Sequence, residues 1–188
     1  ATPSGDGYTI SGTKSFVLDG NTANLIIVAA KTGAGTSLFA VEGDAAGLTR
    51  TSLSTMDQTR KQAKLDFDNT PATLVGEDGK GWDVLIAMLD LAAVSRAAGQ
   101  VGGAQSVLEM AVEYAKVRVQ FGRPIGTFGP VKHHCANMLV ATEQATAGAW
   151  GAARADLDPA EAELAAAAAS CLALPAFSYC AKLNIQVP

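Results

Sequence analysis

Short runs of apolar and β-branched residues, separated by glycine-rich turns, fill the chain up to about residue 75. Runs of this kind at close spacing predict the strands of an antiparallel β-sandwich or barrel. Ser11-Gly12 separates the first two runs, and Pro71 is expected to end the last strand. The predicted strands are 8–10, 14–18, 24–30, 37–41, 48–52 and 63–67.

From Trp82 onward the apolar positions recur every three or four residues, which is the period of a helix. The pattern predicts one helix over 82–118, a second over about 130–155 and a third over 159–186. Asp158 followed by Pro159 is typical of a helix start with proline in the first position. Pro175 is expected to kink the third helix.

Apolar residues on these helices extend beyond one narrow stripe, so the helices require further packing partners. Either a fourth helix or another subunit would supply them. Gly99, Gly102 and Gly103 would each cost roughly 1 kcal/mol in an exposed helix, so close helix packing is their expected reason. The residues expected on the apolar side of the second helix are Val131, Met138, Leu139 and Trp150.

The predicted fold class is therefore α+β and multidomain. An antiparallel β-sandwich or barrel segment over 1–76 precedes an antiparallel helical bundle over 82–188, and the glycine-rich residues 76–81 are expected to be a flexible joint. The chain opens on Ala1 and stops just after a helical pattern, so we expect a fragment of a longer protein.

Composition narrows the classes of function. With 48% hydrophobic and 17% charged residues the chain can bury a core, and its net charge of −4 gives no reason to expect a nucleic acid partner. Cys135, Cys171 and Cys180 lack metal-ligand spacing and are typical of a reducing compartment. The apolar tract 164–174 is too short to span a bilayer. We expect a cytoplasmic protein without a membrane span and without a metal.

The segment RVQFGRPIG, residues 118–126, ends the first predicted helix. A helix stop needs only a glycine and one cation. The additional Arg123, Phe121 and Pro124 suggest a segment that projects outward to hold a flat, anionic ligand. The simpler alternative is a helix stop with solvated arginines.

Four stretches carry a resemblance to a known family. They are GYTISGTK at 7–14, LDFDNTP at 65–71 followed by LVG at 74–76, RVQFGRPIG with the residues to Met138, and 181–187. In this order they resemble the acyl-CoA dehydrogenase family of flavoproteins. The resemblance implies a middle β-domain followed by most of a C-terminal four-helix bundle. It also implies α,β-dehydrogenation of an acyl-CoA thioester, with electrons passed to an electron-transfer flavoprotein.

The resemblance further implies FAD bound across a subunit interface of a homo- or hetero-oligomer. Arg118 would meet the pyrophosphate of the partner's FAD, a role that suits a guanidinium. Gln120 would hydrogen-bond nearby, Phe121 would pack on the adenine side and Gln186 would contact the adenosine half. Phe16 and Val17 would line the isoalloxazine ring, Leu18 would lie at the flavin near N5, and Asp90 would lie near the substrate. Phe16 and Val17 could instead be core residues, and Gln186 and Asp90 solvated ones.

Several residues depart from the family pattern. No catalytic carboxylate is visible. The family usually carries it as a glutamate beyond the last helix, where this chain stops, and some members instead carry an acidic residue beside an arginine in the first bundle helix, where this chain has Ala92 and Ala93. Leu18 replaces a hydroxyl residue expected near the flavin, Gly129 a glutamine, and Pro188 a glycine. Three interpretations follow: part of a complete dehydrogenase, a non-catalytic subunit of a heteromeric dehydrogenase for steroid-type CoA esters, or a flavin monooxygenase of the same fold.

Overall fold

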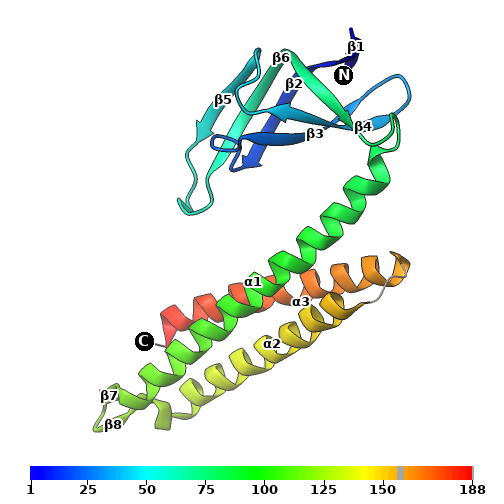
Figure 1. The fold of residues 1–188 in the computed structure, drawn as a ribbon. Helices are drawn as coiled ribbons and strands as arrows, with labels where there is room; N and C mark the ends of the chain where they lie inside the picture. The colour runs from blue at the N-terminus through cyan, green and yellow to red at the C-terminus, as the bar shows by residue number, and fades with distance from the viewer. Residues whose placement is uncertain (156–158, 188) are drawn as a thin grey trace. The chain divides into compact units, whose positions relative to one another are not determined.

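The computed structural model describes residues 1–155 and 159–187, which form two compact units, Ala1–Ile86 and Ala87–Pro188 (Figure 1). The first unit is β-structured, and the second is helical. Asp158 and Pro188, which carried sequence predictions, lie outside the described residues. The predicted α+β fold with a β segment before a helical bundle is confirmed.

The first unit is an antiparallel sheet built around one long strand. That strand, β6 (Gln62–Val75), pairs with β2 (Gly7–Leu18), β4 (Thr36–Glu42) and β5 (Leu48–Leu53). β1 (Thr2–Ser4) pairs with β2, and β3 (Leu25–Lys31) pairs with β4. One strand therefore sets the register of three neighbours.

Alternate residues of these strands point into a single core, as the period of a strand requires. Leu25 and Ile27 of β3 are exposed, whereas Ile26 and Val28, which alternate with them, are buried. The buried core residues are Ile10, Ile26, Val28, Phe39, Val41, Ala63, Leu65, Phe67 and Ala72.

Two predictions about strand ends are wrong. The runs 8–10 and 14–18 belong to one strand, because Ser11-Gly12 forms a register shift in the β2–β6 ladder in place of a turn. Pro71 lies inside β6, opposite Thr9 of β2. Since β5 pairs with β6 only through Phe67 and β4 pairs only from Thr73, proline stands where one side of β6 has no partner strand.

The segment after β6 is tied to the sheet, which corrects the expectation of a flexible joint. The Asp78 carboxylate accepts hydrogen bonds from Thr32 Oγ1 and Ser37 Oγ, both at 2.6 Å. Gly79 N donates to Ser37 Oγ at 2.7 Å. A Cβ on Gly81 would come within 2.9 Å of the Ser37 backbone, so the chain here packs directly against β4.

Three helices form the second unit: α1 (Gly81–Val117), α2 (Gly129–Arg154) and α3 (Pro159–Gln186). The first residues of α1, up to Ile86, belong to the first unit. A two-residue hairpin, β7 (Val119–Gln120) and β8 (Arg123–Pro124), and the short helix η1 (Ile125–Thr127) join α1 to α2. α2 and α3 run antiparallel and are the most closely packed pair (Figure 1). The predicted helix start at Pro159 is confirmed.

Alanine dominates one half of the helical core. The buried residues there are Ala97, Ala145, Ala149, Ala152, Ala169, Ala173 and Ala176. Larger side chains, including Leu108, Met138 and Leu183, fill the half near the hairpin. Met138 is buried as predicted, but Leu139 and Trp150 are exposed in this chain, because the inward face of α2 is made by Met138, Thr142 and the alanines that follow them.

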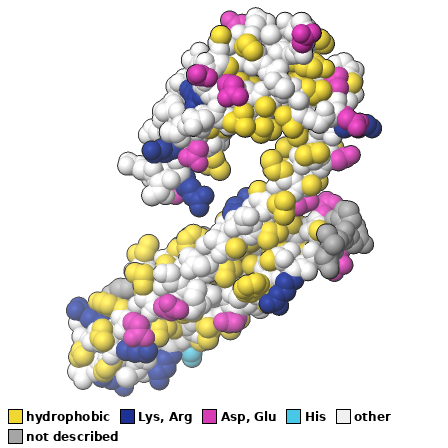
Figure 2. Space-filling model, viewed as in Figure 1, with side chains coloured by type: hydrophobic (Ala, Val, Ile, Leu, Met, Phe, Trp, Pro, Cys, Tyr) yellow, Lys and Arg dark blue, Asp and Glu magenta, His cyan; other side chains and the backbone are white. Residues whose placement is uncertain are grey.

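Large apolar side chains remain on the outside of the helices, including Leu91, Met110, Leu172 and Ile185. Figure 2 shows apolar side chains gathered along the helical unit. By length and composition alone, two segments, Gly81–Val117 and Glu161–Gln186, could also cross a membrane. Such apolar surface on a helix needs a cover.

The three interior glycines of α1, Gly99, Gly102 and Gly103, differ in their surroundings. A Cβ on Gly103 would lie 2.6 Å from Cε2 of Phe177 on α3, whereas Gly99 and Gly102 have no such neighbour. Close packing therefore explains Gly103 alone among the three.

We expect Gly103→Ala to lower the free energy of unfolding by about 1–3 kcal/mol, because the added methyl group overpacks against Phe177. Gly102→Ala is the matched control, and should raise the same free energy by up to about 1 kcal/mol through helix propensity. Urea titrations of both variants measure the difference. Equal effects at the two positions would contradict this packing.

Hydrogen bonds from Ser37 and then Thr32 lower the pKa of Asp78 below its ordinary 3.8. A lowered folded-state pKa stabilises the fold at higher pH, and this stabilisation is lost as the pH falls through that value. Asp78→Ala should therefore unfold at a lower temperature than wild type at neutral pH, with a difference that shrinks below pH 3.8. Thermal scans across pH test this, with the exposed Asp6→Ala as control; a difference that is constant with pH would contradict it.

Candidate functional site

The hairpin after α1 has an unusual backbone. Val119 pairs with Pro124 and Gln120 with Arg123, leaving Phe121 and Gly122 as the turn. Both turn residues have positive φ, 53° and 79°, as a tight two-residue hairpin requires. Glycine adopts this conformation freely, but for a phenylalanine it costs roughly 1–2 kcal/mol. Strain of this kind is often retained at ligand-binding sites.

That strained backbone presents an aromatic ring to solvent. Phe121 is 92% exposed. Its ring packs edge-to-face with the Phe128 ring, and the two ring centroids are 6.2 Å apart. The Arg123 guanidinium lies over the same Phe128 ring, 4.2 Å from its centroid. The Arg123 guanidinium is thus engaged with the Phe128 ring.

Arg118 lies where α1 meets the hairpin. Its backbone N donates to the Tyr114 carbonyl at 2.9 Å, and its carbonyl accepts from Ile125 N at 2.8 Å. These two bonds fix the residue between helix and hairpin. The side chain is exposed and therefore accessible to a ligand. A cation and a flat aromatic ring are thus held three residues apart on one short, ordered element.

The end of α3 reaches the same end of the bundle. Leu183 and Val187 pack in one cluster with Ala115 of α1 and Ile125 of η1. Gln186, next to Val187, is exposed. The structure therefore brings Gln186 to the part of the bundle that carries Arg118, Gln120 and Phe121.

A second strained aromatic residue lies in the β unit. Phe16 has φ 58° at the register shift between Lys14 and Val17, and its side chain is 73% exposed. Leu18 is 59% exposed, while Val17 packs against the β core. The bulge thus presents Phe16 and Leu18 outward, whereas the Val17 side chain belongs to the interior.

Asp90 is far from the hairpin along α1. It is half-buried, and 28 residues separate it from Arg118. At about 1.5 Å per residue this is roughly 42 Å of helix. Ala92 and Ala93 lie beside Asp90 and carry no acid–base group. The Asp90 and Arg118 of one chain therefore cannot contact one small group.

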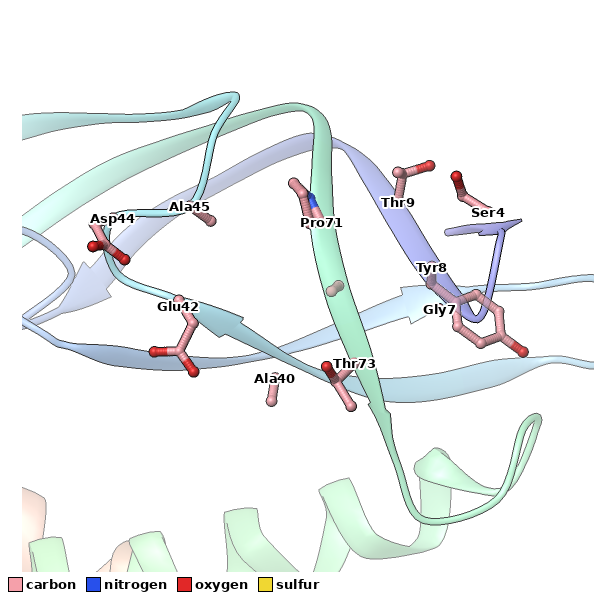
Figure 3. A pocket seen from close by; sticks show the side chains of 11 residues that line it. Ser4, Gly7, Tyr8, Thr9, Ala40, Glu42, Asp44, Ala45, Pro71 and Thr73 are labelled. Atoms are coloured by element: carbon pink, nitrogen blue, oxygen red, sulfur yellow. The ribbon is translucent and has the colours of Figure 1, made fainter.

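The β unit also contains a hollow of about 540 Å³, drawn in Figure 3. Its lining comes from β1, β2, β4, β6 and the turn after β4, and includes Tyr8, Thr9, Glu42, Asp44 and Thr73. None of the predicted site residues lines it, and the lining that the structure describes offers carboxylates and hydroxyls without a cation. It does not suit an anionic ligand. No motif in the sequence marked it, because its residues come from separate segments.

Among residues 1–155 and 159–187, no group of three or more His, Cys, Asp or Glu side chains could hold a metal ion. Cys180 is buried, with Sγ 3.6 Å from Thr142 Oγ1 between α2 and α3. Burial raises the pKa of the Cys135 thiol above its ordinary value. The buried Cys180 side chain therefore packs between the two helices, and the raised pKa of Cys135 disfavours its reactive thiolate form.

Comparison with known proteins shows which family the chain belongs to. Residues 79–187 match the family model described as "Acyl-CoA dehydrogenase, C-terminal domain". The chain is 35% identical over 175 residues to acyl-CoA dehydrogenase IpdE2 of Mycobacterium tuberculosis, covering 92% of this chain and 47% of that relative. The curated relatives it matches are thus at least about twice as long.

Two solved structures have the same fold. One, described as the "Tcur3481-Tcur3483 steroid ACAD G363A variant", matches with a TM-score of 0.87 and 33% identity over 100% of this chain and 50% of that one. The other, described as "Electron transferring flavoprotein of Acidaminococcus fermentans", matches with a TM-score of 0.94 and 29% identity over 100% of this chain and 52% of that one. The predicted resemblance is confirmed: the chain belongs to the acyl-CoA dehydrogenase family.

Proposed function

We propose that this chain is part of an FAD flavoprotein that α,β-dehydrogenates an acyl-CoA thioester and passes electrons to an electron-transfer flavoprotein. The observation that supports it most is the hairpin, where Arg118 stands beside the strained, exposed Phe121. This hairpin lies within the residues that match the family's C-terminal domain. The similarity to the Acidaminococcus fermentans structure, whose description names an electron transferring flavoprotein, supports such a flavoprotein as the electron acceptor.

The residues at the hairpin fit the dinucleotide half of FAD. The Arg118 guanidinium is exposed and can form two charge-assisted hydrogen bonds to a pyrophosphate. Phe121 offers a flat apolar surface to the adenine, and Gln120 and Gln186 supply amide donors and acceptors at the same end of the bundle. Holding Phe121 outward before the ligand arrives lowers the cost of binding.

The bulge on β2 fits the isoalloxazine half. Phe16 is exposed and aromatic, and the exposed Leu18 adds an apolar contact without a hydrogen bond. When bound, FAD would supply the two-electron acceptor that desaturation needs. These side chains would orient the ring and exclude water from it.

The distance along α1 supports a site shared between chains. Asp90 of α1 and Arg118, just after the end of α1, are about 42 Å apart in one chain. A single ligand site that uses both residues would therefore take them from two subunits. The exposed apolar residues of α1 and α3 supply a surface for such an oligomer. We propose that protein, and not lipid, covers these helices, in a cytoplasmic homo- or hetero-oligomer.

A second candidate is a non-catalytic subunit of a heteromeric dehydrogenase for steroid-type CoA esters. It draws on Leu18, Ala92 and Ala93, none of which can act as a base or donate a side-chain hydrogen bond. The 33% identity to a steroid ACAD whose name pairs two proteins supports it. No specific feature of the described residues favours a monooxygenase.

Arg118→Ala in the intact protein should weaken FAD binding about 10- to 150-fold, the value of charge-assisted hydrogen bonds of about 1.5–3 kcal/mol. FAD affinity is measured by flavin fluorescence titration. Arg154→Ala is the matched control, since its guanidinium lies over Trp150 at the other end of α2. The unfolding temperature should change little in both variants, and an Arg118→Ala protein with full FAD affinity would contradict the proposed site.

The two candidate functions differ in their response to acyl-CoA. Anaerobic addition of short- and long-chain and steroid-side-chain CoA esters to the flavin-loaded protein should bleach the visible flavin absorbance if the intact protein is the dehydrogenase. Flavin that is bleached only after a partner chain is added would identify the subunit function. Intact mass measured on the same sample shows whether a partner chain is already present.

A further inference from the structure

The turn that follows the β2 bulge is compact. Gly20 N donates to the Val17 carbonyl at 3.2 Å, and the Asp19 carbonyl accepts from Thr22 N and Ala23 N, both at 2.9 Å. A Cβ on Gly20 would lie 3.0 Å from the Val17 Cβ. The turn therefore rests directly on the bulge, and any shift of the turn is passed to residues 16–18.

Arg50 of β5 reaches this turn from a different part of the sheet. Its Nη1 donates to the Gly20 carbonyl at 3.3 Å, and its Nη2 donates to the carbonyl of Gly43 in the turn between β4 and β5. Gly43 N in turn donates to the Asn24 carbonyl at 2.6 Å. A Cβ at Gly43 would lie 2.5 Å from the Ala23 carbonyl oxygen and would also meet the guanidinium, so glycine is required there. One half-buried cation thus joins the two turns.

The bulge needs this support because its own ladder is interrupted. Between Lys14 and Val17 the register with β6 shifts, and Phe16 adopts its left-handed backbone there. Beyond the bulge, Leu18 pairs with Gln62, and Asp19 N donates to the Lys61 carbonyl at 3.0 Å. β6 therefore holds one side of the turn, and Arg50 holds the other.

We infer that Arg50 is a positioning residue, which acts through the Gly20 turn to hold Phe16 and Leu18 in place for the isoalloxazine ring. The inference rests on the proposed FAD site but concerns a residue that does not contact the ligand. A guanidinium suits this role because its planar fork can donate to two carbonyls at once, which a lysine ammonium at the end of a flexible stem does poorly.

The test compares Arg50→Ala and Arg50→Lys with wild type in the intact, FAD-loaded protein. Arg50→Ala should increase amide hydrogen exchange at residues 19–24 about tenfold, since the lost donors leave two turns untied. It should also shift the visible flavin absorbance bands and weaken FAD binding several-fold. Arg50→Lys should recover part of each effect, and millimolar guanidinium added to Arg50→Ala should recover part of the flavin spectrum.

Arg154→Ala, which removes a guanidinium from the helical unit, is the control and should leave exchange at 19–24 and the flavin bands unchanged. Global destabilisation is separated by working well below each variant's unfolding temperature. Faster exchange with wild-type flavin bands and affinity would overturn the inference and leave the proposed function standing. A wild-type protein that binds no FAD would overturn both.

Discussion

The helical unit depends on close packing through alanine. Because the inward faces of α2 and α3 are made of Ala145, Ala149, Ala169 and Ala173, the helices approach closely while burying little apolar area. Many larger apolar side chains of α1 and α3, such as Leu91, Met110 and Ile185, consequently face outward. The bundle is therefore shaped for a neighbour on its outside. A ligand site shared between chains is consistent with this arrangement, since part of the exposed apolar surface lies along α1, the helix that ends just before Arg118.

Both halves of the proposed flavin site use the same device, an aromatic residue in left-handed backbone. Phe121 occupies a hairpin turn and Phe16 a bulge, and in each case the strain turns a ring toward solvent. The surroundings hold this strain: the Phe128 ring at the hairpin, and Arg50 with the Gly20 turn at the bulge. The strained backbone at these two residues lowers the stability of the fold, and it holds two exposed aromatic rings in position for a planar ligand.

Sequence periodicity located the strands and helices well, but not how the strands join. Ser11-Gly12 permits a turn or a bulge, and only pairing with β6 decides between them. Pro71 is tolerated because one side of β6 has no partner strand there, although the other side pairs with β2, and this follows from the topology. Leu139 and Trp150 share the helical period, yet the alanine face is the one that packs. In the sequence, only the neighbouring Gly122 hints that Phe121 has a positive φ. Nothing in the sequence indicates that Arg50, a single arginine in a strand, binds the Gly20 turn.

The exposed apolar surface of α1 also affects what happens to the chain between synthesis and assembly. Until a partner covers it, such a surface invites aggregation and recognition by chaperones and proteases. If the ligand bridges two subunits, its binding energy adds to that of assembly and depletes the uncovered form. The cellular abundance of this protein would then follow the supply of its cofactor, with surplus subunits removed before they accumulate.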